Sequence, residues 1–368
     1  MSSKMWDKNP STSLIARKTD YFRFVKSIFE PENEKFRKMF LIYTQYYYKS
    51  AFGENCDKNI KRKQTKYKDI SLKKLINMFD VEFPRLQNDD ILEMIEEMHQ
   101  RVCNQLGLYP CSIKYAKDDM FAVKITMAYD PGKNEIIVSK SSMKYLGGLT
   151  FLQSIMHETY HHYQYVNADR FAKGQPYDKA VLTTLALSCN TSGLQKLFSN
   201  IQQSHSVYSY FIDPIEAEAN FFAMNNINKF ISQGYLTTPK NNIHNYSKYK
   251  KLYYEMYKED TFNMMKRVYK KTFSETKQTY QKYKKDEIKD SNFLRNYNRY
   301  TDNQLKNLLD RLYKEISSKD IDNLMENYKN NARSYYVEQN QDNEKNKKML
   351  DDLSKRLNKE QMDTNQVL

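Results

Sequence analysis

The sequence predicts an α+β protein that is mostly helical, with one small sheet in the middle of the chain. Two observations lead to this prediction. Seven of the eight glycines lie between Gly107 and Gly234, and neither Gly nor Pro occurs after Pro239. Because these residues punctuate local structure, we expect short elements and tight turns in the middle and long helices in the last third. With 368 residues, of which 40% are hydrophobic, the chain can form two or three domains with real cores.

The first expected region, residues 1–85, is basic and helical. Pro31 followed by Glu32 and Glu34 is typical of a helix start, because Pro is favoured at the first helical position and carboxylates near it. The apolar residues that come next have helical spacing, namely Phe36, Met39, Phe40 and Tyr43. Residues 57–69 are rich in lysine and are expected to form a loop or linker.

The second expected region, residues 86–235, opens with a helix over 88–106. Asn88 or Asp89 is the expected N-cap, and Gly107 is the expected end. Three strand candidates follow, at 111–116, 121–128 and 135–139. The last two flank the sequence DPGKN at 130–134, which is typical of a hairpin turn. Gly147 and Gly148 then separate the strands from a further helix over roughly 149–167.

The third expected region, residues 236–368, consists of long helices and a polar tail. Two apolar stripes with helical spacing predict two amphipathic helices. They comprise Leu305, Leu308, Leu309, Leu312 and Ile316, and then Ile321, Leu324, Met325, Tyr328 and Ala332. Residues 338–349 lack such a pattern and are expected to be solvated.

The formal net charge of +14 is unevenly distributed along the chain. Residues 1–70 hold 16 basic and 8 acidic side chains and residues 241–300 hold 15 and 7, so each segment has a net charge of +8. Lysine alternates with tyrosine in both flanks, which is compatible with nucleic-acid binding. The alternative is a solvated, lysine-covered surface over inward-facing tyrosines, and we favour it because no known nucleic-acid-binding motif occurs.

Several absences narrow the class of protein. No apolar stretch approaches the ~20 residues of a membrane-spanning helix, and the N-terminal residues lack the apolar segment of a signal peptide. The four cysteines are scattered and form no CxxC pair, which argues against a disulfide scaffold and against a cysteine-ligated structural zinc site. We therefore expect a cytoplasmic protein with reduced cysteines and no membrane partner.

The expected helix at 149–167 contains the motif HETYH, which has the form HExxH. Residues four apart lie on one face of a helix, so His157 and His161 can bind one zinc ion. Glu158 is rotated by about 100° from His157 and can hydrogen-bond a zinc-bound water and accept its proton. The other reading is a surface helix with clustered polar residues, but an apolar stripe indicates that its back is buried.

A catalytic zinc usually has three protein ligands, so another residue must complete the set. The metzincin spacing is absent, because residues 164 and 167 are Gln and Asn. Glu216, in the sequence DPIEAEANFFA at 213–223, is the favoured third ligand, and Glu218 and His205 are the rivals. Glu216 also fits a capping box with Asp213, which would need no metal.

These two motifs together resemble those of the gluzincin metallopeptidases, and most nearly the ImmA/IrrE-like family. The resemblance spans residues 86–235 and is weak outside the motifs. It implies a zincin-like catalytic domain, with a small antiparallel or mixed sheet and an active-site helix, flanked by the basic helical regions. It also implies Glu216 as third zinc ligand and Asn220 as a supporting residue. The first motif departs from the common HELGH form, which leaves subfamily and substrate open.

The remaining histidines near the motif are assigned structural or lining roles. His162 is expected to be a polar neighbour rather than a ligand, because adjacent side chains diverge on a helix. His99 is expected to be structural. A second group precedes Glu216 and could line the cleft or stabilise an oxyanion, namely His205, Tyr208 and Tyr210.

The sequence thus predicts a zinc-dependent endopeptidase that cleaves a specific protein or peptide substrate with Glu158 as general base. One alternative is a protease held on DNA by the basic flanks, in the manner of SprT-like proteases, although those generally use a third histidine. Another is a non-catalytic zincin-like protein of a phage or mobile element with a structural or nucleic-acid-associated role.

Overall fold

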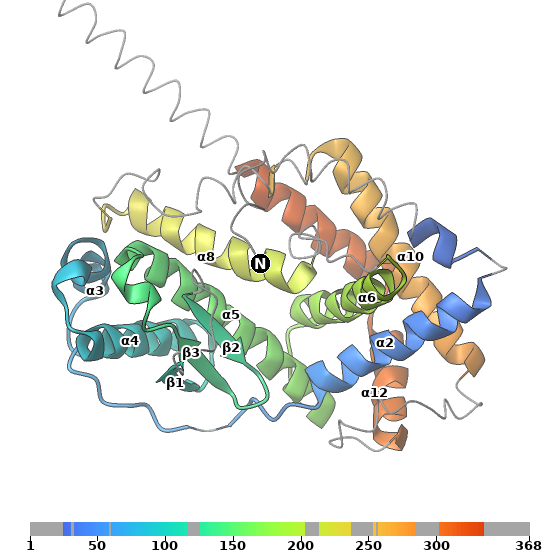
Figure 1. The fold of residues 1–368 in the computed structure, drawn as a ribbon, viewed down its shortest axis with the longest axis horizontal. Coiled ribbons are helices and arrows are strands. Elements are labelled where there is room, and N and C mark those ends of the chain that lie inside the picture. The colour runs from blue at the N-terminus through green and yellow to red at the C-terminus, as the bar shows by residue number, and fades with distance from the viewer. Residues whose placement is uncertain are drawn as a thin grey trace, which may run out of the picture.

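The structure is a computed structural model, and it describes residues 25–30, 33–58, 60–116, 126–202, 213–236, 253–254, 257–283 and 302–334. These residues are mostly helical and include one small mixed sheet (Figure 1), so the predicted α+β class is confirmed. None of the helices in these ranges is both long and apolar enough to cross a membrane.

The sheet has three short strands: β1 (Ser112–Tyr115), β2 (Met127–Asp130) and β3 (Glu135–Val138). Their order is β1-β3-β2, with β1 parallel and β2 antiparallel to β3. The predicted hairpin is therefore confirmed, although β2 runs to Asp130 rather than ending at residue 128. The part of that candidate at 121–125 lies outside the described residues. At the end of the turn, Asn134 has a φ of 54°, a left-handed conformation that Asn tolerates better than most residues.

The candidate site lies between α5 (Gly148–Lys173) and α8 (Pro214–Ser232), and α4 (Asn88–Leu106) packs against α5. Helix α5 is central and contacts α4, α8 and β2 (Figure 1). Helix α4 ends at the left-handed Gly107 as predicted, but its N-cap is Gln87, without a side-chain cap bond, so the expected cap at Asn88 or Asp89 is wrong. Helix α5 continues past the expected end at residue 167 until the left-handed Gly174.

The other helices pack around this centre. In the N-terminal region lie α2 (Glu34–Phe52), α3 (Leu72–Asn77), the π-helical turn η2 (Met78–Glu82) and the 3₁₀ turn η3 (Phe83–Arg85). A further 3₁₀ turn, η4 (Ser142–Lys144), precedes α5. Beyond α5 lie α6 (Lys179–Gln202), α10 (Glu259–Tyr283), α12 (Asp302–Glu315) and a helix over 318–334. The helices predicted after residue 31 and after residue 302 are thus confirmed.

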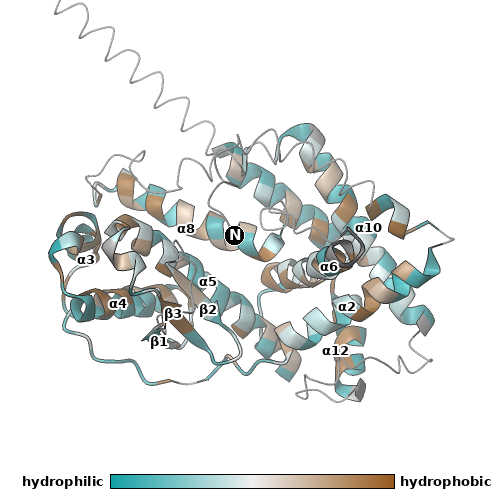
Figure 2. Ribbon diagram, in the orientation of Figure 1, coloured by the Kyte–Doolittle hydropathy of each residue, from teal (hydrophilic) through white to brown (hydrophobic). Residues whose placement is uncertain are grey.

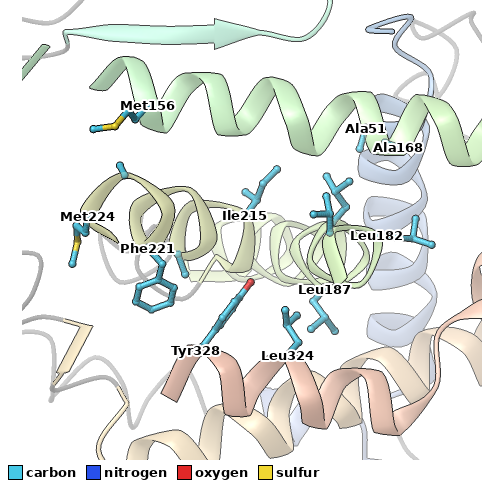
Figure 3. Packing of buried hydrophobic residues seen from close by; sticks show 14 of the residues in the cluster. Ala51, Met156, Ala168, Leu182, Leu187, Ile215, Phe221, Met224, Leu324 and Tyr328 are labelled. Atoms are coloured by element: carbon cyan, nitrogen blue, oxygen red, sulfur yellow. The ribbon is translucent and has the colours of Figure 1, made fainter. Parts of the chain in front are cut away.

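One large hydrophobic cluster joins the described parts of all three expected regions, from Val25 to Ala332. Figure 3 shows the part of it beneath α8, where Phe221 lies near Tyr328 of the C-terminal helix. The Tyr328 hydroxyl donates to the carbonyl of Pro214 at 3.2 Å, which ties this helix to the start of α8. Strand β3 is apolar along most of its length (Figure 2), since three of its four residues are Ile or Val and all four are buried.

The start of α5 is held by a close backbone approach. A Cβ atom on Gly148 would lie 2.1 Å from the carbonyl oxygen of Phe79 and 2.6 Å from the side chain of Phe83. Since real Cβ atoms do not approach that closely, only glycine allows α5 to begin against η2 here. The position of the helix that carries the HExxH motif is therefore set at its first residue.

Candidate metal centre

Helices α5 and α8 bring the three predicted ligands together. His157 and His161 lie one turn apart on α5, and their Nε2 atoms are 2.9 Å apart. Glu216, in the first turn of α8, places Oε2 3.4 Å from His157 Nε2 and Oε1 3.6 Å from His161 Nε2. Their potential ligand atoms all lie within 4.8 Å of one another. We call these three residues the HExxH cluster.

The spacing of the HExxH cluster fits a tetrahedral zinc ion. Zinc–nitrogen and zinc–oxygen bonds of about 2.0–2.1 Å imply ligand atoms about 3.3 Å apart in a tetrahedron. The two imidazole nitrogens are 2.9 Å apart, and each lies 3.4 or 3.6 Å from one of the two carboxylate oxygens of Glu216. In addition, Oε2 of Glu216 is a buried oxygen without a hydrogen bond among the described residues. The donor set of two imidazoles and one carboxylate is one that catalytic zinc sites use.

A buried glutamine fixes the tautomer of His161. The Gln164 Nε2 donates to the carbonyl of Ile215 at 3.1 Å and to Glu218 Oε2 at 3.0 Å. Because a carbonyl only accepts, Oε1 of Gln164 must face His161 Nδ1, 2.9 Å away. His161 therefore has a proton on Nδ1, and Nε2, which faces His157 and Glu216, is the nitrogen that can bind a metal ion. Such an outer partner is typical of metal-binding histidines.

Glu158 lies beside the HExxH cluster, as the helical rotation predicts. The backbone N–H of Tyr129 in β2 donates to Glu158 Oε2 at 2.9 Å, which orients the carboxylate. Burial raises the pKa of Glu158, while His157 and His161 oppose the rise. A carboxylate with a raised pKa is a better proton acceptor near neutral pH than an ordinary exposed one.

The electrostatics of the HExxH cluster couple the two helices. Burial lowers the pKa of His161, but the nearby Glu216 outweighs it and brings the pKa to about 9. Burial raises the pKa of Glu216, but the charge of His161 and contacts with both imidazoles take it well below its ordinary value. In the metal-free protein the Glu216 carboxylate is thus ionised and the neighbouring His161 is protonated. A bound metal cation would take over the positive charge of His161.

At the start of α8, Asp213 caps the helix, whereas Glu216 is free to act as a metal ligand. Asp213 is the N-cap, and its Oδ1 accepts from the backbone N–H of Ile215 at 3.2 Å. The Glu216 carboxylate instead faces the two imidazoles. The rival Glu218 lies outside the HExxH cluster. It accepts a hydrogen bond from Gln164, whose other end hydrogen-bonds His161, so it contacts the cluster only through Gln164.

Asn220 supports Glu216 through the backbone. Its Nδ2 donates to the carbonyl oxygen of Glu216 at 2.8 Å and to the hydroxyl of Tyr253 at 3.0 Å. It thus holds the first turn of α8 in place and does not touch the carboxylate. The other candidates for the cleft, namely His205, Tyr208 and Tyr210, lie outside the described residues, as does His244.

Two contributors to the candidate centre were not expected from the sequence. Gln164 lies three residues after His161, on the same helix face, and this spacing is a signal that could have indicated it. The Tyr129 backbone has no such signal, because any residue at that point of β2 supplies an N–H. Its identification requires the packing of β2 against α5.

His162 and His99 lie on the far side of α5, away from the HExxH cluster. Both are 1% exposed, and their ring centroids are 5.9 Å apart. The sequence-based expectation that neither belongs to the predicted centre agrees with this placement. They instead form a second group with Cys111, in which the potential ligand atoms lie within 4.8 Å of one another.

No family model matches the chain, and the comparisons with curated proteins and with solved structures found no match.

The basic flanks are partly neutralised by acidic neighbours. In the expected basic loop, Lys63 pairs with Glu96 at 2.7 Å and Lys66 pairs with Asp90, both on α4. In α10, lysines at 266 and 270 pair with acidic residues of the helix over 318–334. These pairs favour the structural reading of the flanks where they are described, and nucleic-acid binding stays a prediction.

Proposed function

We propose that this chain is a zinc-dependent endopeptidase. The observation that carries the proposal is the convergence of His157, His161 and Glu216 beside a buried Glu158. Zinc bound by these three residues supplies Lewis acidity for the scissile carbonyl and lowers the pKa of a coordinated water. The same arrangement supports the zincin-like catalytic domain that the resemblance implies.

The role of Glu158 in this proposal is proton transfer. Its Oε2 is held by the N–H of Tyr129, which leaves the other carboxylate oxygen to take a proton from the attacking water. The protonated carboxyl then gives that proton to the leaving amine. Gln164 holds the proton of His161 on Nδ1, so the lone pair of Nε2 stays directed at the ion.

The proposed substrate is an extended segment of a protein or peptide. Strand β2 is at the edge of the sheet in the described part of the chain, and it contacts α5. An extended chain can add to such an edge by backbone hydrogen bonds. Because the Tyr129 N–H already binds Glu158, a segment aligned along β2 would have its backbone close to the general base.

The experiment is metal analysis of the purified full chain, combined with proteomic cleavage profiling of the wild type and Glu158→Gln. We expect zinc in both proteins and cleavage products only with the wild type. Zinc without any difference in cleavage would overturn the enzymatic proposal and favour the non-catalytic alternative. Absence of metal from the freshly purified wild type would contradict the zinc site itself.

A further inference from the structure

A second cluster of metal-binding side chains lies behind the HExxH helix. It comprises His99 and Cys103 on α4, Cys111 just before β1, and His162 on α5. We call these four residues the buried cluster. All four are buried, with exposed fractions of 0–6%. None of them is part of the HExxH cluster, and the proposed peptidase chemistry does not use them.

The distances within the buried cluster suit a metal ion. Nε2 of His99 lies 3.4 Å from the sulfur of Cys111 and 3.5 Å from that of Cys103. His162 contributes a ring nitrogen within 4.8 Å of the ligand atoms of His99 and Cys111. His99, Cys111 and His162 thus converge on one point, and Cys103 lies beside His99 but outside this group of three. The spacing of the cysteines along the sequence gives no sign of it.

His99 has the tautomer that a ligand needs. The Thr159 hydroxyl donates to the carbonyl of Ile155 at 2.6 Å, so its oxygen accepts from His99 Nδ1 at 2.8 Å. The proton of His99 is therefore on Nδ1, and Nε2 presents a lone pair to the cluster. This lone pair accepts the backbone N–H of Cys111 at 3.1 Å, the one hydrogen bond with which an ion would compete.

His162 is the observation that points to a ligand. Neither of its ring nitrogens makes a well-aligned hydrogen bond among the described residues, although the backbone of Cys56 lies nearby, and the side chain is 99% buried. An imidazole N–H and lone pair without partners are costly in such a position. A bound cation would satisfy the lone pair that the protein leaves unpaired.

We propose that the buried cluster binds a structural zinc ion through His99, Cys111 and His162, with the side chain of Cys103 moving in from beside His99 as the fourth ligand. Two imidazoles and two thiolates form a common tetrahedral set for structural zinc, and full enclosure by protein is typical of structural rather than catalytic sites. Binding releases the two thiol protons to solvent, so Zn²⁺ and two thiolates form a neutral unit. A neutral unit is compatible with the apolar surroundings of Cys103, which include Leu108 and Val166.

The experiment uses cobalt as a spectroscopic substitute for zinc in the full chain. The test protein is the double variant His157→Ala/His161→Ala, which lacks the HExxH cluster's imidazoles. We expect it to retain one cobalt per chain with thiolate-to-metal charge-transfer absorption, and zinc-loaded protein to show a zinc–sulfur distance of about 2.3 Å by X-ray absorption. The wild type should bind two ions. Absence of sulfur ligation in both proteins would overturn the proposal.

A second comparison identifies the ligands. Cys111→Ser in the double-variant background should weaken the charge-transfer band, whereas Cys189→Ser, at a buried cysteine of α6 outside the cluster, should leave it unchanged. An unchanged band in Cys111→Ser would overturn the ligand assignment. If Cys111→Ser does not fold, the X-ray absorption of the double variant still decides, because that protein keeps all four proposed ligands.

Discussion

His161 and His162 are neighbours in sequence, yet they belong to two different environments. Each ring nitrogen of His161 has a partner, Gln164 on one side and His157 on the other, and its side chain is 10% exposed. His162 points about 100° away around α5, is buried, and makes no well-aligned hydrogen bond among the described residues. One helix thus presents the HExxH cluster on one face and part of the buried cluster on another. The predictions below test whether the two clusters are independent.

The largest expected effect concerns the ligand assignment in the HExxH cluster. Glu216→Ala removes the one carboxylate that faces both imidazoles. We expect zinc affinity at this cluster to fall by more than about 100-fold, since even partners that do not touch an ion contribute 10–100-fold. Competition with a chelator measures it. A variant that still binds zinc as tightly as the wild type would show that Glu216 is a cap and not a ligand.

The second effect is a dependence of stability on pH in the metal-free protein. Burial lowers the pKa of His162 to about 4, against small opposing effects of the Cys56 backbone and Asp57. Between pH 6.5 and 4 the unfolded chain binds a proton that the folded chain excludes, so stability falls as the pH falls, by up to about 3 kcal/mol.

The measurement is chemical denaturation in the presence of a chelator at pH 7 and pH 5, for the wild type and His162→Asn. Asp213 and Glu218 have pKa values raised by burial to about 7, and their titration opposes the trend in both proteins. Burial also lowers the pKa of His99, with His162 as a second cause. The difference between the two proteins therefore reports on His162 together with its effect on His99. Equal slopes would mean that His162 is protonated, or solvated, in the folded state.

The third effect concerns Gln164, which hydrogen-bonds the candidate ligand His161. Gln164→Leu removes the acceptor of the His161 Nδ1 proton, and we expect a 10–100-fold loss of zinc affinity. Gln164→Glu keeps an acceptor at that position and should bind zinc more tightly than Gln164→Leu. Titration of each variant with a zinc-sensitive dye gives the affinities. Equal affinities for the two variants would remove Gln164 from the site.

The smallest effect concerns the far face of the same helix. Thr159→Val leaves the His99 Nδ1–H without its acceptor, so we expect a loss of about 1–3 kcal/mol in the free energy of unfolding. Thr191→Val is the matched control, because Thr191 is also buried and also donates to a carbonyl four residues earlier, but has no histidine partner. Denaturation of both variants measures the difference. If Thr191→Val costs as much, the His99 contact contributes nothing.

The sequence predicts the helices and strands of this fold better than it predicts the tertiary contacts between them. The helix at 88–106, the hairpin around residues 130–134 and the HExxH helix follow from local signals such as Gly107 and the turn residues. The predicted end of the HExxH helix at residue 167 is too early, since α5 continues to Lys173 and ends at the left-handed Gly174. The N-cap at Gln87 has no side-chain signature at all.

In the candidate site, only the residues that lie close together in the sequence can be predicted from it. His157, Glu158 and His161 share one helix, so their relation is set by helical geometry. Glu216 is 55 residues beyond His161, and its approach depends on how α8 packs on α5. The buried cluster combines four residues from three elements, and the spacing of its cysteines even argued against a zinc site. Long-range packing, which no motif encodes, brings them together.

The residues between the conserved positions of the HExxH motif are usually free to vary, but on α5 they are not. The Thr159 hydroxyl holds His99, and the ring of Tyr160 stacks on Phe222 with centroids 4.7 Å apart. Every side chain from residue 157 to 162 therefore has a structural or chemical task. A substitution anywhere in this stretch would therefore disturb a candidate ligand, a buried carboxylate or a packing contact of α5.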